Sequence, residues 1–168
     1  MTIAETFLAE LKFEAENTRK LLEIVPLQNG DFKPHLKSMT LARLTTHIAE
    51  TPGWLAITVN KDEFDYTKTN YQPFIPNTTA ELLSFFDRQV EVAEQALENK
   101  TDDEMMKYWT MLADGKVLYS YPKAAIVRNM ILNHSIHHRG QLTVYLRLLD
   151  IPLPNIYGPT ADSIIDSK

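Results

Sequence analysis

Three of the five histidines stand close together, where residues 134–138 run His-Ser-Ile-His-His. On a helix, which turns by about 100° per residue, His134 and His138 lie about 40° apart on one face, one turn above the other. Two imidazoles in that arrangement can bind one metal ion together. His137 lies about 60° from His134 on the other side, so we expect it to be the weaker candidate for the same site.

The residues around this pair predict that it faces inward. Largely apolar side chains recur at spacings of four and three, which is the period of a buried helical stripe. The stripe consists of Val127, Ile131, His134, His138, Gln141, Tyr145 and Leu148. Burying an unsatisfied polar group costs roughly 1 to 3 kcal/mol, and a divalent cation would satisfy both imidazoles. The alternative is a pair of buried histidines that donate to carbonyl groups and serve packing.

A catalytic zinc-type site needs a third protein ligand. His35 follows a proline in a connecting segment, and we expect it to face solvent. His47 shares a helix face with Leu44 and Thr51, so it can point inward. Glu50, three residues after His47, is a candidate to hydrogen-bond a ligand or to act as a base, and the alternative is a solvated surface charge.

The composition indicates one ordinary domain over residues 1–168, with 44% hydrophobic and 23% charged residues. A net charge of -5 and the lack of a long Lys/Arg run argue against nucleic acid as a partner. The absence of cysteine excludes disulfides, a cysteine nucleophile and thiolate metal ligands. Neither a signal peptide nor a membrane span is indicated, so we expect no membrane partner and a cytoplasmic location.

Four amphipathic helices are predicted to position these residues. They run from Thr2 to Pro26, from a cap at Ser38 or Thr40 to Pro52, from Thr78 to Asn99, and from Pro122 to Leu149. Thr2 and Thr78 each stand three residues before a glutamate, which is the form of a capping box. Pro52 is expected to kink or break the second helix about one turn after His47. Trp54 is expected to anchor the chain that follows.

The remaining segments connect the helices. Residues 61–72 have no helical period and form a long loop closed by prolines, and the acidic run Thr101–Glu104 is predicted to be a solvated turn. Residues 105–112 and 117–119, around the turn 113–116, predict a short β-hairpin. The prolines of residues 151–159 predict an extended tail over the bundle. The predicted fold is therefore all-α: a four-helix bundle with a small β-hairpin between helices 3 and 4.

These motifs resemble the signature of the DinB superfamily. His134-Ser-Ile-His-His-Arg-Gly-Gln141, together with the tail Pro154-Asn-Ile-Tyr-Gly-Pro-Thr-Ala-Asp162, is similar to the family's C-terminal motif. Leu44-Thr-Thr-His-Ile-Ala-Glu50 resembles its second helix, whose histidine is a metal ligand. The likeness covers nearly the whole chain, although residues 61–121 carry no signature.

The resemblance implies a bundle of DinB/YfiT type in which His47, His134 and His138 bind one divalent cation, zinc or nickel. It also implies a homodimer. Some relatives transfer or isomerise small-molecule substrates with low-molecular-weight thiols such as bacillithiol, and others are described as metal-dependent hydrolases. Three neutral imidazoles leave the cation its full charge, which favours a thiolate or hydroxide near neutral pH.

Our main hypothesis is a metal-dependent enzyme of the low-molecular-weight-thiol S-transferase type. The alternatives are a metal-dependent hydrolase and a non-catalytic metal-binding dimer. Glu50 and Gln141 are the candidate catalytic residues, although a structural role for Gln141 beside a metal-bound histidine is equally open. Arg139 points away from the histidine face, and we expect it to bind a helix end, a carboxylate or a subunit partner. Pro52 departs from many relatives, which affects the shape of the substrate pocket.

Overall fold

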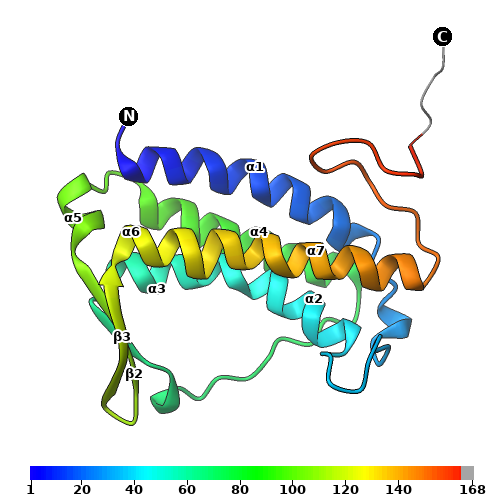
Figure 1. The fold of residues 1–168 in the computed structure, drawn as a ribbon, viewed down its shortest axis with the longest axis horizontal. Coiled ribbons are helices and arrows are strands. Elements are labelled where there is room, and N and C mark those ends of the chain that lie inside the picture. Colours follow the sequence, from blue (N-terminus) through cyan, green and yellow to red (C-terminus); the bar gives the residue numbers. More distant parts are fainter. Residues whose placement is uncertain (164–168) are drawn as a thin grey trace.

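The computed structural model describes residues 1–163, which form a bundle of helices with a small sheet at one end (Figure 1). Its long helices are α1 (Ile3–Glu23), α4 (Thr79–Leu97) and a C-terminal helix made of α6 (Lys123–Ile126), a π-helical stretch η4 (Val127–Leu132) and α7 (Asn133–Leu148). The remaining side consists of α2 (Leu41–Glu50) and α3 (Trp54–Asn60), joined by a 3₁₀ turn η2 (Thr51–Gly53). Short 3₁₀ helices η1 (Leu27–Asn29) and η3 (Tyr66–Lys68) lie in the connections. The predicted helical bundle is confirmed.

The helices begin at the caps that their sequences indicate. Thr2 closes a full capping box at the start of α1. Thr40, the second of the two alternatives, caps α2 by accepting a hydrogen bond from the backbone of Arg43. Thr78 caps α4, but the carboxylate of Glu81 accepts from the backbone of the preceding residue, so the box predicted there is not closed.

The predicted break after His47 is confirmed. Helix α2 ends at Glu50, and the chain passes through the 3₁₀ turn that contains Pro52 before α3 begins at Trp54. Proline lacks the amide that would continue the α-helical hydrogen bonds, which explains why the helix changes direction here. Both α2 and α3 pack against α4, and α2 also packs against α7.

The sheet at one end of the bundle has three strands in the order β1 (Glu63–Asp65), β2 (Tyr108–Ala113) and β3 (Lys116–Pro122). Strands β2 and β3 form the predicted hairpin, with Trp109 paired to Tyr121. Its turn residues Asp114 and Gly115 have φ values of 50° and 75°, as a type I′ turn requires at both central positions.

Two predictions for the connections are wrong. The loop 61–72 contains strand β1, which pairs in parallel with β2 far along the chain, so no local pattern indicates it. Thr101–Glu104 is the cap and first turn of a helix, α5 (Asp102–Met106), because Thr101 and Glu104 close a capping box. Met105, predicted to begin the hairpin, is instead buried in α5, and the strand begins at Tyr108.

Two clusters of buried apolar residues fill the bundle. The first includes Phe7, Leu11, Leu55, Leu97, Met105, Ile131 and Leu132, and the second includes Leu22, Leu41, Leu44, Ile48, Leu82, Phe86, Leu142 and Tyr145. On the C-terminal helix, His134 and His138 lie between Leu132 of the first cluster and Leu142 of the second. The turns that carry the two histidines therefore lie between helix segments that belong to the two clusters.

The buried stripe of the C-terminal helix differs from the predicted one. Gln141 and Leu148 are exposed, whereas Leu142 and Leu146 are fully buried. The difference begins after His138, where the buried side chains continue at Leu142 and Leu146, because spacings of three and four both fit one face of an α-helix. His138 keeps its inward position and is 7% exposed.

The tail after α7 lies over the bundle, as predicted. The hydroxyl of Tyr157 donates to the carboxylate of Glu14 on α1. Arg139, 3% exposed, forms an ion pair with Glu14 and also contacts Tyr157. The expectation that Arg139 binds a carboxylate away from the histidine face is thereby confirmed.

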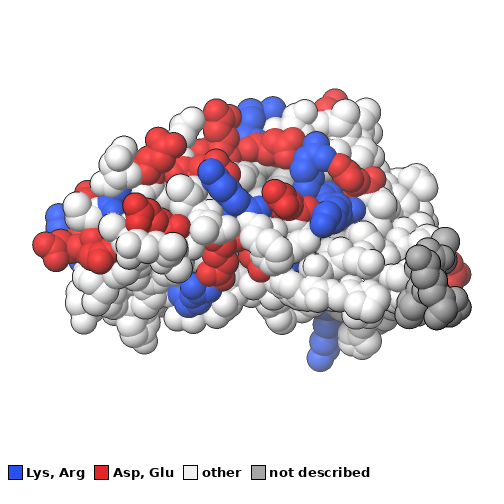
Figure 2. Space-filling view, turned by 90° about the horizontal axis from the view of Figure 1, so that it is seen from above, with Lys and Arg blue, Asp and Glu red and all other residues white. Residues whose placement is uncertain are grey.

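One face of the molecule carries cations and anions side by side (Figure 2). Arg19 and Lys12 on α1 pair with Asp87 and Glu94 on α4, at 3.0 and 3.7 Å. Exposed pairs of this kind contribute little to stability, roughly 0 to 1 kcal/mol each.

Among the described residues, no helix is long and apolar enough to cross a membrane.

Candidate metal centre

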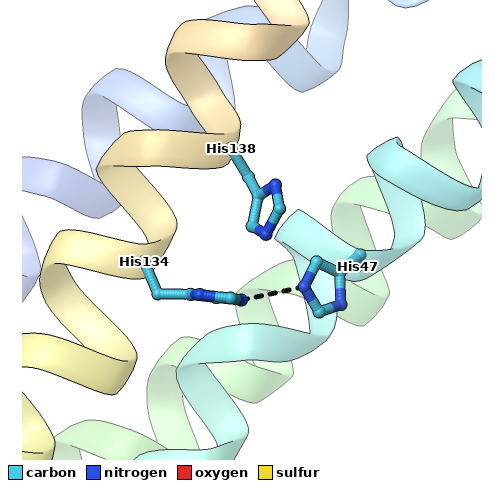
Figure 3. A group of neighbouring side chains, drawn as sticks. All are labelled: His47, His134 and His138. Carbon is cyan, nitrogen blue, oxygen red and sulfur yellow. Dashed lines mark hydrogen bonds between the residues drawn. The ribbon is translucent and has the colours of Figure 1, made fainter. Parts of the chain in front are cut away.

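Three histidines converge between α2 and α7 (Figure 3). His47 projects from α2, and His134 and His138 project from consecutive turns of α7. One ring nitrogen from each lies within 4.8 Å of the others. The Nε2 atoms of His47 and His134 are 2.9 Å apart, and the ring centroid of His138 is 4.6 Å from that of His47.

These distances fit a divalent cation. Zinc–nitrogen bonds of about 2.0 to 2.1 Å place two nitrogens of a tetrahedral site about 3.3 Å apart. The 2.9 Å between Nε2 of His47 and Nε2 of His134 is shorter than this separation, and the 4.8 Å within which all three nitrogens lie is longer. Small rotations of the side chains would bring the nitrogens to the separation that zinc requires. The donor set consists of imidazoles alone, which suits zinc, nickel, copper or iron.

Glu50 contacts His47 at Nδ1, the ring nitrogen that points away from the other two histidines. The Nδ1–H of His47 donates to Oε1 of Glu50 at 3.1 Å, which leaves Nε2 of His47 with its lone pair directed at the other two histidines. Arg43 donates to the same oxygen at 2.9 Å, and the hydroxyl of Tyr71 donates to Oε2 at 2.6 Å. Burial alone would raise the pKa of Glu50, but the hydrogen bonds from His47, Tyr71 and Arg43 outweigh it and lower the pKa below its usual value. Glu50 is therefore an ionised carboxylate whose two oxygens are both engaged.

Gln141 supports His138 in the same way. Its side-chain oxygen accepts from Nδ1–H of His138 at 2.7 Å, and its amide nitrogen donates to Nε2 of His137 at 3.0 Å. The bond fixes the tautomer of His138 with the Nε2 lone pair free. His137 itself is exposed and lies outside the group of three. His35, the other candidate, is exposed in the connector between α1 and α2, as expected.

The electrostatics of the group disfavour protonated histidine. Burial, followed by the nearby rings of His138 and His47, lowers the pKa of His134 to about 4. Burial also lowers the pKa of His138, although its hydrogen bond to Gln141 acts in the opposite direction. Because cations bind neutral imidazole, both shifts keep lone pairs available at neutral pH.

Trp54 forms an aromatic wall beside the histidines. Its ring centroid is 5.3 Å from that of His47 and 5.9 Å from that of His134. Pro52 accounts for this position, because the 3₁₀ turn that it occupies ends α2 and begins α3 at Trp54. The turn at Pro52 thus places the aromatic wall of the site, and the three histidines stay together.

Two contributors to the site were not predicted from the sequence. Arg43 lies one helical turn before His47, and the same helical spacing that indicated Glu50 would have placed it on that face. Tyr71 reaches the site from the irregular segment before α4, which has no periodicity to indicate it.

The lowered histidine pKa values predict how acid affects the protein once its metal has been removed by a chelator. Between pH 6.5 and about 4, unfolded His134 binds a proton that folded His134 does not, so acid favours unfolding. The free energy of unfolding should therefore decrease as the pH falls from 6.5 toward 4. Urea midpoints across this range should decline less steeply for His134→Gln than for the wild type, whereas His35→Gln, a change in the exposed connector, should match the wild type. Equal slopes in all three proteins would contradict this account.

Known proteins resemble this chain over nearly its whole length. The model of the DinB family matches residues 1–164. The chain is 27% identical over 159 residues to the uncharacterised protein YrdA of Bacillus subtilis (strain 168), covering 93% of this chain and 89% of that protein.

Solved structures share the fold. The DinB-like protein YjoA of Bacillus subtilis superposes with a TM-score of 0.72 at 19% identity, covering 92% of this chain and 99% of that one. A DinB-like protein of Bacillus cereus ATCC 10987 gives 0.71 at 22% identity, covering 91% and 97%. With the family model matching almost the entire chain, this protein belongs to the DinB family.

Proposed function

We propose that this protein binds one divalent cation, zinc or nickel, through Nε2 of His47, His134 and His138. The observation that carries the proposal is the convergence of these three side chains from two helices within 4.8 Å. The tautomers of His47 and His138 support it, because Glu50 and Gln141 each accept the Nδ1 proton and leave Nε2 free. A cation held by three neutral imidazoles supplies a full positive charge, which lowers the pKa of a coordinated thiol or water.

We propose further that the protein is an enzyme of the low-molecular-weight-thiol S-transferase type. In this reaction the thiol sulfur forms a bond to an electrophilic carbon of a small-molecule substrate, a leaving group departs with the bonding electrons, and the thiol proton passes to solvent. The chain has no cysteine of its own, so the thiol must come from a separate molecule such as a bacillithiol-like cofactor.

The state of Glu50 favours thiol transfer over hydrolysis. Glu50 is the carboxylate that hydrogen-bonds a histidine of the group, and His47, Arg43 and Tyr71 already occupy its two oxygens. A carboxylate engaged in this way is poorly placed to accept a proton from water. A thiol starts from a pKa of about 8.5 and water from about 15.7, so a coordinated thiol still ionises more readily than coordinated water when the same cation lowers both values. We therefore assign Glu50 and Gln141 to positioning the histidines, in place of acid–base catalysis.

The metal assignment predicts one divalent ion per chain in protein purified without an affinity tag. Replacing His47, His134 or His138 by alanine should abolish tight binding, because two imidazoles hold a cation much more weakly than three. Elemental analysis by mass spectrometry measures the ratio. His137→Ala is the matched control from the same helix and should keep full metal content. Full metal content in His134→Ala would show that the site is misassigned.

The transferase assignment predicts that a small thiol binds the metal-loaded protein and releases about one proton near pH 7, since free thiols are mostly protonated there. Calorimetry in buffers of different ionisation enthalpy counts the released protons. His134→Ala, which should lack the cation, provides the baseline. If several cellular thiols neither bind nor release protons, the transferase assignment fails, and a hydrolase or a non-catalytic metal-binding protein remains.

We also propose that the protein is a homodimer, which rests on its DinB family membership. Light scattering at micromolar concentration should give about twice the chain mass, and a value near 19.3 kDa would count against a dimer. The expected cytoplasmic location stays a prediction.

A further inference from the structure

The irregular segment 69–78, between η3 and α4, reaches the histidine centre through Tyr71. In Figure 1 this segment crosses from the sheet to the start of α4 on the side of α3 and α2. Most of its residues are exposed, and Tyr71 itself is 50% exposed. Its hydroxyl nevertheless donates to Oε2 of Glu50 at 2.6 Å, and Glu50 is 6% exposed. An exposed segment thus places one polar atom against a buried carboxylate.

The hydroxyl completes the set of donors that fixes this carboxylate. Oε1 of Glu50 accepts from His47 and Arg43, and among the described residues Tyr71 donates the hydrogen bond to Oε2. Donors on both oxygens set the plane of the carboxylate, and that plane sets the direction of the bond to Nδ1 of His47. Without the hydroxyl, Oε2 would be a buried acceptor without its partner, and the carboxylate would gain freedom to rotate.

The hydroxyl is suited to a constant donor role. Burial and the contact with Glu50 raise the pKa of Tyr71 to about 12, so the proton stays on the phenol. The guanidinium of Arg43 lies 6.0 Å from the centroid of the same ring. Tyr71 therefore belongs to one connected group with Arg43, Glu50 and His47.

We propose that Tyr71 is a positioning residue that links segment 69–78 to the metal affinity of the histidine centre. This inference rests on the proposed metal site. Tyr71 holds Glu50, and Glu50 holds His47 with Nε2 directed at the cation. Because coupling between two equilibria is reciprocal, a cation that favours this arrangement also favours the ordered form of the segment, to the same extent. The segment then closes when the metal binds and loosens when it leaves.

The first test compares zinc affinity in wild-type protein, Tyr71→Phe and Tyr66→Phe, by competition with a chromophoric chelator. Tyr71→Phe removes one oxygen atom and should weaken zinc binding about 3- to 10-fold, the scale of one hydrogen bond, because Tyr71 acts on His47 only through Glu50. Tyr66, exposed in η3 of the same connection, provides the matched control and should keep wild-type affinity. Equal affinity in all three proteins overturns the inference.

A double-mutant cycle separates positioning from a general effect on the segment. If Tyr71 acts through Glu50, Tyr71→Phe should change zinc affinity less than twofold when Glu50→Ala is already present. A full 3- to 10-fold loss in that background would mean that the tyrosine acts by another route, and would overturn the inference.

Limited proteolysis supplies a readout of the segment itself. Zinc should slow cleavage within 69–78 in wild-type protein and should protect Tyr71→Phe markedly less, and equal protection overturns the inference. If the wild-type protein binds no zinc at all, the proposed metal site is wrong, and the inference that rests on it is wrong as well. Zinc binding with unaltered affinity in Tyr71→Phe overturns the inference alone.

Discussion

Three imidazoles face one another inside the helical bundle, and the cost of placing a positive charge on any of them is the constraint on which this structure depends. Their nitrogens lie within 4.8 Å, so protonating one of them places a charge beside the others in a partly buried site. The chain meets this constraint by lowering the pKa of His134 and His138 and by directing the Nε2 lone pairs of His47 and His138 inward. Glu50 and Gln141 do this for His47 and His138 by accepting their Nδ1 protons. The apolar clusters on either side of His134 and His138 hold α7 in the position that this requires.

Both helices that carry the histidines are irregular beside them. Helix α2 ends three residues after His47, where the turn containing Pro52 redirects the chain and brings Trp54 against the site. The C-terminal helix is π-helical over Val127–Leu132, immediately before the turn that carries His134. Such stretches cost helix stability and recur at functional sites. Each irregularity changes the direction or phase of side chains, so together they set how the ligand-bearing turns face one another.

Much of this arrangement follows from local patterns. The shared helix face of His134 and His138, a cap at Ser38 or Thr40 and the break at Pro52 depend on residues within one or two helical turns, and each was predicted; Thr40 is the residue that caps the helix. Strand β1 and Tyr71 depend on partners that the sequence does not indicate: β1 pairs with distant β2, and Tyr71 meets Glu50 across 21 positions. The stripe after His138 depends on packing, because spacings of three and four both fit one helix face, and Leu142 and Leu146 are buried in place of the predicted Gln141 and Leu148. Thr101–Glu104 differs from these cases, because its capping box is a local pattern and indicates the helix that the structure has there.

The charges around the centre balance without neutralising a bound cation. Glu50 is ionised, but Arg43 donates to it at 2.9 Å, so the pair adds little net charge to the site. The carboxylate acts on the centre through a hydrogen bond to the far side of His47, and not as a ligand. A dication held by the three imidazoles would therefore retain its attraction for an anionic partner, which a carboxylate ligand would have reduced. The pairing that engages both oxygens of Glu50 would thus leave such a cation free to attract an anion, which is what the proposed thiol transfer requires.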